Sequence, residues 1–417
     1  MLNSVGKFIY LHIHVKIDTM ISLSVLEDIV EEHTKYIQRE KVIHRDLADE
    51  VEKSLDYEEI TVVKGVRRAG KTFLLYELFR KHGGLYINFE DERLYGFTLE
   101  DFEKLNDIAS RINASFMFLD EVQVVQGWEK FAHRAHRRIK IVVTGSNSSL
   151  LGSDYSSALV GRTKSYSVFP LSYNEFLRFC SLENERNSFL EYMRIGGFPR
   201  IVLTGDIELA KEYLDSIIYK DLIGHHNIRN PQALRNLIVF LLSNVGKEFS
   251  YRSLKTVSGL KHDQTIKEYI GLLEDVFLVN TIMRYSPSLK KQARYGKKIY
   301  AVDPAFIHLG KRGDADHGRI LENVIFLHLK RKGYDLYYGM DKKEVDFIIA
   351  KGLRPLKIVN VTYMAENEKT REREISSLKF FMDTMKVPAE IISLYPFKIP
   401  DNINFHLAHR YFNSESN

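Results

Sequence analysis

The chain has few of the residues that mark secreted, membrane-spanning or loosely linked proteins. Its 417 residues include one cysteine, Cys180, and nine prolines. A single thiol excludes a disulfide framework and fits a reducing cytoplasm. No stretch approaches the roughly 18 apolar residues that a spanning helix needs, and no Gly/Ser-rich or Pro-rich linker is present. We therefore expect closely packed cytoplasmic domains with no membrane partner.

The first 19 residues do not fit a targeting signal. Their apolar run over residues 8–17 is short, is interrupted by His and Lys, and lacks the small-residue cleavage site of a signal peptide. Met20 stands just ahead of a helical segment over residues 25–32. We interpret residues 1–19 as an upstream-start artefact or a mobile arm, and residues 1–58 as an N-terminal arm and helical segment.

The bulk composition is that of an ordinary globular protein, with 44% hydrophobic and 28% charged residues. The length suggests two to four domains. A formal net charge of +5 is too small, in a chain of this size, to select a class of partner.

Residues 59–170 alternate short apolar runs with helical stretches. The runs are continuously hydrophobic, which is typical of strands covered on both faces in a parallel sheet. Strands separated by helices indicate βαβ units. The block therefore predicts an α/β nucleotide-binding core with strands at Ile60–Lys64, Leu85–Phe89, Ser115–Asp120, Lys140–Thr144 and Tyr166–Phe169.

The turn after the first of these strands matches the phosphate-binding pattern G-x-x-x-x-G-K-[ST] at every fixed position. Its glycines let backbone N–H groups turn inward around an anion, and the following helix adds the positive end of its dipole. We expect Lys71 to reach the β- and γ-phosphates of ATP, and the Thr72 hydroxyl to ligate Mg²⁺. The predicted cofactors are thus ATP and Mg²⁺. The predicted binding residues are Gly65, Val66, Arg67, Arg68, Ala69, Gly70, Lys71 and Thr72.

Two acids end the apolar strand that finishes at residue 120. The carboxyl edge of a parallel sheet places them beside the phosphate-binding turn. We expect Asp120 to hold the Mg²⁺ shell, directly or through water, and Glu121 to act as general base for the attacking water. Catalysis is therefore assigned to Glu121 together with Lys71.

Two further polar positions each allow two interpretations. Asn147, or second Ser146, follows the next strand and is a candidate sensor of the γ-phosphate; a turn that caps the next helix is the alternative. Arg162 precedes the last strand and is a candidate arginine finger for a neighbouring subunit, which implies a homo-oligomer. A surface ion pair is the alternative for Arg162.

A series of motifs runs along the chain from about residue 20. They are Gly-x-Arg-Arg-x-Gly-Lys-Thr, Tyr86–Asp91, Leu119–Gln123 with Trp128, Thr144–Asn147, Gly161–Thr163 and Pro170–Ser172. In this order they resemble prokaryotic AAA-type ATPases, common in archaea, whose C-terminal region is similar to nucleases of the restriction-endonuclease-like fold. The resemblance implies an AAA-like P-loop core, a helical lid over residues 171–230, a winged helix over 231–305 and an endonuclease-like domain over 306–417. In the lid, Gly196–Arg200 matches the glycine-proline segment of the family, and Arg200 is either a second phosphate sensor or part of a structural turn.

Residues 231–305 have the pattern of a winged helix-turn-helix. Three helical segments, Ala233–Asn244, Tyr251–Val257 and Asp263–Glu274, precede two β-like runs. The loop between those runs interleaves Lys and Arg with Tyr, which suits contact with a phosphate backbone. We expect DNA contact through residues 262–298; a lid or protein-interaction module is the alternative.

The last domain departs from the nuclease pattern. Glu322 on a helix and Asp346 on a strand are in place, but the next strand carries Asn360 and Thr362 where an active nuclease of this fold has Glu-x-Lys. An amide binds Mg²⁺ poorly, and a hydroxyl cannot supply the charge of a lysine. We expect no cleavage and interpret the domain as a DNA- or protein-binding scaffold.

The sequence thus predicts Mg²⁺-dependent ATP binding and hydrolysis that moves the lid and the winged helix, acting on or regulated by DNA or a protein. The alternatives are a regulatory switch with little turnover and a residual nuclease.

Overall fold

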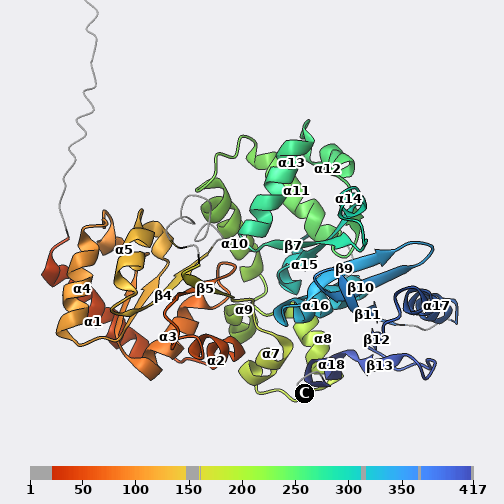
Figure 1. The fold of residues 1–417 in the computed structure, drawn as a ribbon, viewed down its shortest axis with the longest axis horizontal. Coiled ribbons are helices and arrows are strands. Elements are labelled where there is room, and N and C mark those ends of the chain that lie inside the picture. Colours follow the sequence, from red (N-terminus) through yellow and green to blue (C-terminus); the bar gives the residue numbers. More distant parts are fainter. Residues whose placement is uncertain (1–20, 147–158, 160, 311–315, 365–367, 415–417) are drawn as a thin grey trace, which may run out of the picture.

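Two β-sheets form the framework of the molecule, one in an N-terminal and one in a C-terminal lobe, with helices between them (Figure 1). The expected arm over residues 1–19 and Asn147 lie outside the part of the chain that is described. The computed structural model describes residues 21–146, 159, 161–310, 316–364 and 368–414.

The N-terminal lobe contains a fully parallel sheet in the strand order β2-β3-β4-β1-β5. The first four predicted strands are confirmed, with ends that shift by a residue at most. The fifth strand was predicted over Tyr166–Phe169, but it begins earlier, at Thr163. The Ile60 amide donates to the Arg162 carbonyl, so β5 pairs with β1 from the first residue of β1. The strands are β1 (Ile60–Lys64), β2 (Leu85–Asn88), β3 (Phe116–Asp120), β4 (Lys140–Gly145) and β5 (Thr163–Ser167).

Successive residues of these strands face two different cores. Phe118 and Val142 pack with α2 and α3, whereas Met117 and Ile141 pack with α1, α4 and α5. The sheet is therefore the middle of three layers, which explains its continuous hydrophobicity. The helices are α1 (Leu23–Arg39), α2 (Asp46–Glu52), α3 (Lys71–His82), α4 (Asp101–Arg111) and α5 (Trp128–Ala135), with short turns η1 (Glu92–Leu94) and η2 (Val122–Val124).

A group of helices follows the sheet and connects the two lobes (Figure 1). Its first helix is fixed by a capping box, in which Ser172 and Glu175 each accept from the backbone N–H of the other. Its last element is π-helical, a conformation often found at functional sites. The elements are α7 (Tyr173–Cys180), α8 (Arg186–Ile195), α9 (Pro199–Thr204), α10 (Leu209–Ser216) and η4 (Ile217–Ile223).

The three helices predicted between residues 233 and 274 are confirmed, and the two β-like runs form the antiparallel pair β7 and β8. The elements are α11 (Pro231–Ser243), β6 (Glu248–Phe249), α12 (Tyr251–Ser258), α13 (Asp263–Asp275), β7 (Val279–Arg284), α14 (Leu289–Gln292) and β8 (Lys297–Ala301).

The second sheet crosses the expected domain boundary at residue 305. Its order is β13-β12-β11-β10-β9-β7-β8-β6, because β7 pairs in parallel with β9. Phe347 packs with α15 and α16 on one face, and Ile348 packs with α17 on the other. The remaining elements are α15 (Pro304–Gly310), α16 (His317–Arg331), β9 (Asp335–Met340), β10 (Glu344–Lys351), β11 (Arg354–Thr362), α17 (Glu368–Met385), β12 (Ala389–Ser393), β13 (Asn404–Leu407) and α18 (Ala408–Ser414).

Within the described ranges, no helix has both the length and the apolar character needed to cross a membrane.

A buried lysine links β8 to acids of the C-terminal lobe. The Nζ atom of Lys298 lies 2.9 Å from Glu344, 3.6 Å from Glu322 and 3.7 Å from Asp346. Burial raises the pKa of Glu322 to about 7, although the charge of Lys298 opposes the shift. The sequence placed Lys298 in the stretch expected to contact DNA. The structure corrects this for Lys298, which is 1% exposed and neutralises carboxylates of its own chain.

Replacing Lys298 with Met should destabilise the fold more at pH 8 than at pH 6. Without the ammonium, the buried Glu322 and the partly exposed Asp346 lose their cation. Breaking a buried ion pair costs about 3 kcal/mol. An acid whose pKa is raised in the folded state stabilises the fold at low pH, and that stability is lost as the pH rises through the folded pKa. Urea unfolding at both pH values measures the difference.

The matched control is Lys290→Met, on an exposed residue of α14, which should change the unfolding free energy by less than about 0.5 kcal/mol. If Lys298→Met lowered the unfolding free energy equally at both pH values, the assignment of Lys298 as the cation that neutralises these carboxylates would be contradicted.

Candidate nucleotide-binding site

The phosphate-binding turn lies between β1 and the amino end of α3, as the sequence predicts. A Cβ at Gly65 would lie 2.1 Å from the carbonyl oxygen of Val168, so only glycine lets the chain after β5 pass this close. Gly70 precedes α3 with φ of 101°, a conformation that favours glycine. The spacing of the two glycines in the motif therefore has a backbone cause.

The Lys71 side chain extends over the turn and is buried. Its Nζ donates to the carbonyl oxygen of Gly65 at 3.1 Å and lies 3.7 Å from a carboxylate oxygen of Glu121. The ammonium thus spans the gap between the turn and the end of β3, at the positive end of the α3 dipole. A phosphate group fits this combination of a fixed cation and inward amides.

Asp120 is fully buried at the carboxyl end of β3. One of its oxygens accepts from the Tyr86 hydroxyl at 2.7 Å and from the Asn88 amide at 3.3 Å, and the other accepts from the Thr144 hydroxyl. These donors come from β2 and β4, the strands on either side of β3. The carboxylate is thereby held in one orientation before any ligand arrives.

Burial raises the pKa of Asp120 to about 6, and the negative charge of Glu121 adds to the shift. Hydrogen bonds from Thr144, Tyr86 and Thr72 oppose it. The hydrogen bond from Thr72 places its hydroxyl, the predicted Mg²⁺ ligand, beside Asp120. Two oxygen ligands suited to Mg²⁺ are therefore adjacent at the end of β3.

Glu121 is held in a left-handed backbone conformation, with φ of 51°. Its N–H donates to Thr144 Oγ1 at 2.9 Å, and its carboxylate accepts from the Gln123 amide at 2.6 Å. The second carboxylate oxygen faces Lys71. This turn aims the carboxylate of Glu121 toward the phosphate-binding turn, where a general base would have to act.

The Arg67 side chain turns away from the phosphate position and binds acids on other elements. It contacts Asp221 of η4 with two nitrogens, the shorter distance being 2.9 Å, and Glu90 at 3.1 Å. Ser146 donates to the same Asp221 at 3.3 Å. The turn, the end of β4 and the π-helical segment therefore meet at one buried carboxylate.

Arg68 and Arg200 lie on one side of the turn, around Tyr213. The Arg68 guanidinium is 5.8 Å from the centre of the Tyr213 ring. Burial raises the pKa of Tyr213, and the charges of both arginines oppose that rise. The amino end of α9 lies at the turn, since a Cβ at Gly70 would lie 3.6 Å from Pro199. The role of Arg200 as a second phosphate sensor stays a prediction.

Two sequence-predicted residues are not joined to this site. Asn147 lies outside the described residues. Arg162 lies at the amino end of β5, whereas the phosphate-binding turn follows the carboxyl end of β1, so the two are at opposite edges of one parallel sheet. It lines a surface cavity with Glu58, Glu59 and His136. A finger role toward a neighbouring subunit stays a prediction.

Glu322 and Asp346, the acids that the sequence singled out in the C-terminal lobe, both lie within 3.7 Å of the Nζ atom of Lys298. Glu322 accepts from the Tyr300 hydroxyl at 2.8 Å, and Asp346 accepts from the Val361 amide at 2.8 Å. Asn360 donates to Glu374 of α17 at 2.8 Å. Among the described residues, no group of three or more His, Cys, Asp or Glu is arranged to hold a metal ion.

Sequence reasoning missed the groups that hold the predicted ones in place. Thr144 stands near the carboxyl end of β4, and that position in the pattern was an available signal. Tyr86 is the second residue of β2 and reaches Asp120 only through the length of its side chain. Asp221 lies 154 residues from its partner Arg67 and had no signal in the sequence.

Two family descriptions match the chain. The family described as "AAA domain" matches residues 57–177, which hold the parallel sheet and the phosphate-binding turn. A "Domain of unknown function (DUF8612)" matches residues 186–314, from α8 to beyond α15.

Relatives extend along most of the chain. An uncharacterized protein of Methanocaldococcus jannaschii, MJ1544, is 33% identical over 405 residues, which cover 89% of this chain and 89% of that protein. An uncharacterized protein of Haemophilus influenzae is 32% identical over 324 residues, which cover 71% of this chain and 80% of that protein.

Solved structures are more distant. The Walker-type ATPase paby2304 of Pyrococcus abyssi is 17% identical, with a TM-score of 0.46, and the match covers 65% of this chain and 97% of that one. Cdc6p of Pyrobaculum aerophilum is 13% identical, with a TM-score of 0.28, over 74% of this chain and 97% of that one. Likeness at this level carries no argument about function. Because the AAA match coincides with the P-loop and the acid pair, and MJ1544 is similar along nearly its whole length, the chain belongs to the MJ1544 family of AAA-type P-loop ATPases.

Proposed function

We propose that the chain binds Mg²⁺-ATP at the P-loop and hydrolyses it. The observation that carries the proposal is the meeting of Lys71 with Glu121, 3.7 Å apart, beside the buried Asp120. Thr72 and Asp120 would hold Mg²⁺, since hydroxyl and carboxylate oxygens suit it. Mg²⁺, when bound, screens the negative charge of the phosphates.

Phosphate binding, proton transfer and support of the two acids fall to different residues of this site. Lys71 and the inward amides of the turn bind and orient the phosphates. Glu121 accepts the proton of the attacking water, and Gln123 fixes the plane of its carboxylate. Thr144 supports both acids, because it donates to Asp120 and accepts from the Glu121 amide.

Turnover is coupled to the lid through Arg67 and Asp221 in this proposal. In their ion pair Asp221 is buried and the Arg67 side chain is 12% exposed. The pair links the P-loop to η4, so a shift of the turn changes the position of the segment that leads to α11. The alternative, a regulatory switch with little turnover, uses the same contacts and differs only in rate.

Replacing Glu121 with Gln should lower kcat for ATP by at least about 100-fold and leave the Kd for Mg²⁺-ATP unchanged, because only proton transfer is lost. Lys71→Ala should abolish binding. ATP should change amide exchange over residues 217–223 in wild type and Glu121→Gln but not in Lys71→Ala. Steady-state phosphate release, calorimetry and hydrogen exchange measure these three effects.

Equal, slow turnover in wild type and Glu121→Gln would favour the switch. Absence of any adenine-nucleotide affinity in wild type with Mg²⁺ would remove the proposed function altogether.

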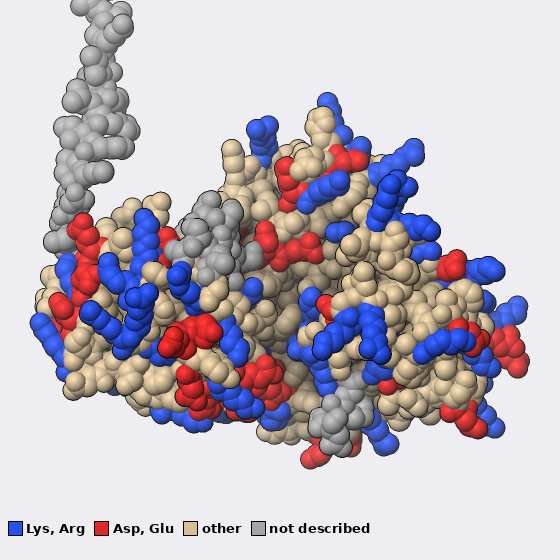
Figure 2. All heavy atoms as spheres, in the orientation of Figure 1, with Lys and Arg blue, Asp and Glu red and all other residues tan. Residues whose placement is uncertain are grey.

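We favour DNA as the partner of the surface over α12 to α14, because basic side chains gather there (Figure 2). The alternative is that this surface binds a protein. Lys290, Lys291 and Arg294 lie exposed on or beside α14. Further exposed basic residues of this surface are Arg252, Lys261 and Lys267.

Changing Lys290, Lys291 and Arg294 together to Ala should weaken binding to duplex DNA and lower the slope of log Kd against log salt by about 2 to 3, since each phosphate contact releases counterions. Fluorescence anisotropy across salt concentrations measures the slope. A variant with Lys41, Lys53 and Lys130 of the N-terminal lobe changed to Ala has the same charge loss and should keep the wild-type slope. Equal slopes for both variants would argue against this surface.

The C-terminal lobe acts as a scaffold rather than a nuclease in this proposal, because an amide and a hydroxyl stand where Glu and Lys are needed. Plasmid DNA incubated with Mg²⁺ or Mn²⁺ should be nicked no faster by wild type than by Asp346→Ala. Nicking by wild type that Asp346→Ala abolishes would restore the residual nuclease as a function.

A further inference from the structure

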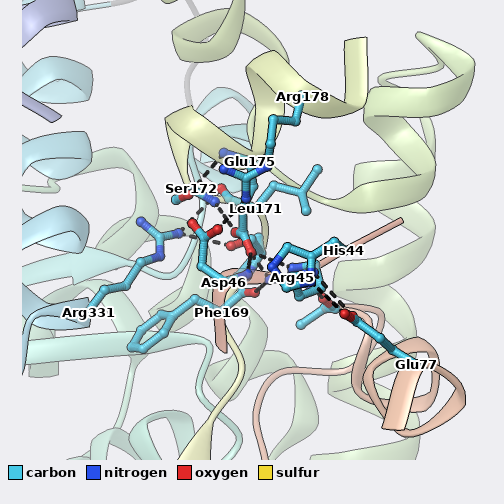
Figure 3. Close-up of polar contacts among 12 residues, drawn as sticks. His44, Arg45, Asp46, Glu77, Phe169, Leu171, Ser172, Glu175, Arg178 and Arg331 are labelled. Atoms are coloured by element: carbon cyan, nitrogen blue, oxygen red, sulfur yellow. Dashed lines mark hydrogen bonds and ion pairs between the residues drawn. The ribbon is translucent and has the colours of Figure 1, made fainter. Parts of the chain in front are cut away.

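Arg45, between α1 and α2, is buried where three separate segments of the chain meet (Figure 3). Its Nε donates to Glu175 at 2.8 Å, one Nη donates to the Ala69 carbonyl at 2.9 Å, and the other donates to the Phe169 carbonyl at 2.9 Å. A single side chain thus joins the P-loop, the end of the parallel sheet and the first lid helix.

The bond to Ala69 restrains the P-loop at the residue before Gly70. A trans peptide is planar, so its carbonyl and the following N–H point in opposite directions. Holding the Ala69 oxygen on the outside of the turn therefore holds the Gly70 N–H toward the inside. Glycine by itself would let this peptide rotate, because it accepts both positive and negative φ.

Glu175 is itself fixed, so Arg45 has a rigid partner. Its carboxylate accepts from the Ser172 N–H at 2.8 Å and from the Asp46 N–H at 3.1 Å, in addition to Arg45. It is 4% exposed, and a buried charge-assisted bond with several partners keeps its geometry better than an exposed ion pair.

A second arginine reaches the same place from the C-terminal lobe. Arg331 of α16 donates to the Pro170 carbonyl at 3.0 Å and lies 5.3 Å from the centre of the Phe169 ring (Figure 3). The segment over residues 169–172 is therefore held by Arg45 on one side and by Arg331 on the other.

We propose that Arg45 is a positioning residue for nucleotide binding, which orients the Gly70 N–H toward a nucleotide phosphate by anchoring the Ala69 carbonyl, with Glu175 fixing Arg45. The inference rests on the proposed function, since it assigns a further residue to the same phosphate-binding site. The ligand class is nucleoside di- and triphosphates, because both present phosphates to the turn. Arg45 itself does not touch the nucleotide.

Arg45→Lys tests the proposal. Lysine keeps the positive charge, but its single nitrogen cannot reach Glu175, the Ala69 carbonyl and the Phe169 carbonyl at once, which three different nitrogens of Arg45 contact. The Kd for Mg²⁺-ATP and for ADP should both rise about tenfold, the size expected for one lost bond to a charged group, while kcat at saturating ATP stays within about threefold. Glu175→Gln should shift both Kd values in the same direction, and the double variant should bind no worse than Arg45→Lys. Binding is measured by calorimetry at a temperature where circular dichroism shows every variant folded.

The matched control is Arg178→Lys, an exposed arginine on α7 that pairs with Asp46 and should leave both Kd values unchanged. A folded Arg45→Lys that binds both nucleotides within twofold of wild type overturns the inference and leaves the proposed function standing. If Arg45→Lys does not fold, unchanged Kd values in Glu175→Gln overturn it equally. A wild type without nucleotide affinity overturns the proposed function, and the inference with it.

Discussion

The approach of Lys71 to the acids at the end of β3 is the interaction on which the N-terminal lobe depends. It exists because parallel strands end at one edge of the sheet, and the order β3-β4-β1 places a single strand between the acids and the P-loop. That intervening strand supplies Thr144, which supports both acids. Burial makes these charges costly unless they are paired, and each has hydrogen-bond or ion-pair partners.

Buried charges also connect the elements that surround the sheet. Arg67 with Asp221 joins the P-loop to η4, and Arg45 with Glu175 joins it to α7. Arg331 extends the second connection to α16 in the C-terminal lobe. In each case an arginine is used, whose planar guanidinium makes several directed bonds at once and so fixes orientation as well as distance.

In the C-terminal lobe, acids from different elements surround one internal cation. Glu322 is buried and Asp346 is partly exposed, and both lie near Lys298 of β8, a strand of the sheet that also contains β7 and β9. An internal ammonium satisfies carboxylates that would otherwise attract an external cation. This arrangement agrees with the scaffold role proposed for the lobe.

The sequence by itself determined the parallel strands, the P-loop and the acid pair, because continuous apolar runs and one contiguous motif are local properties that hardly depend on the rest of the fold. It also placed Asn360 and Thr362 where the resemblance to nucleases would require Glu and Lys. Only the tertiary structure decided that Arg67 turns to Asp221, that Lys298 is buried among acids, and that Arg45 holds Ala69. These contacts join residues separated by 24 to 154 positions. Their geometry follows from how helices and sheets pack, which no local pattern specifies.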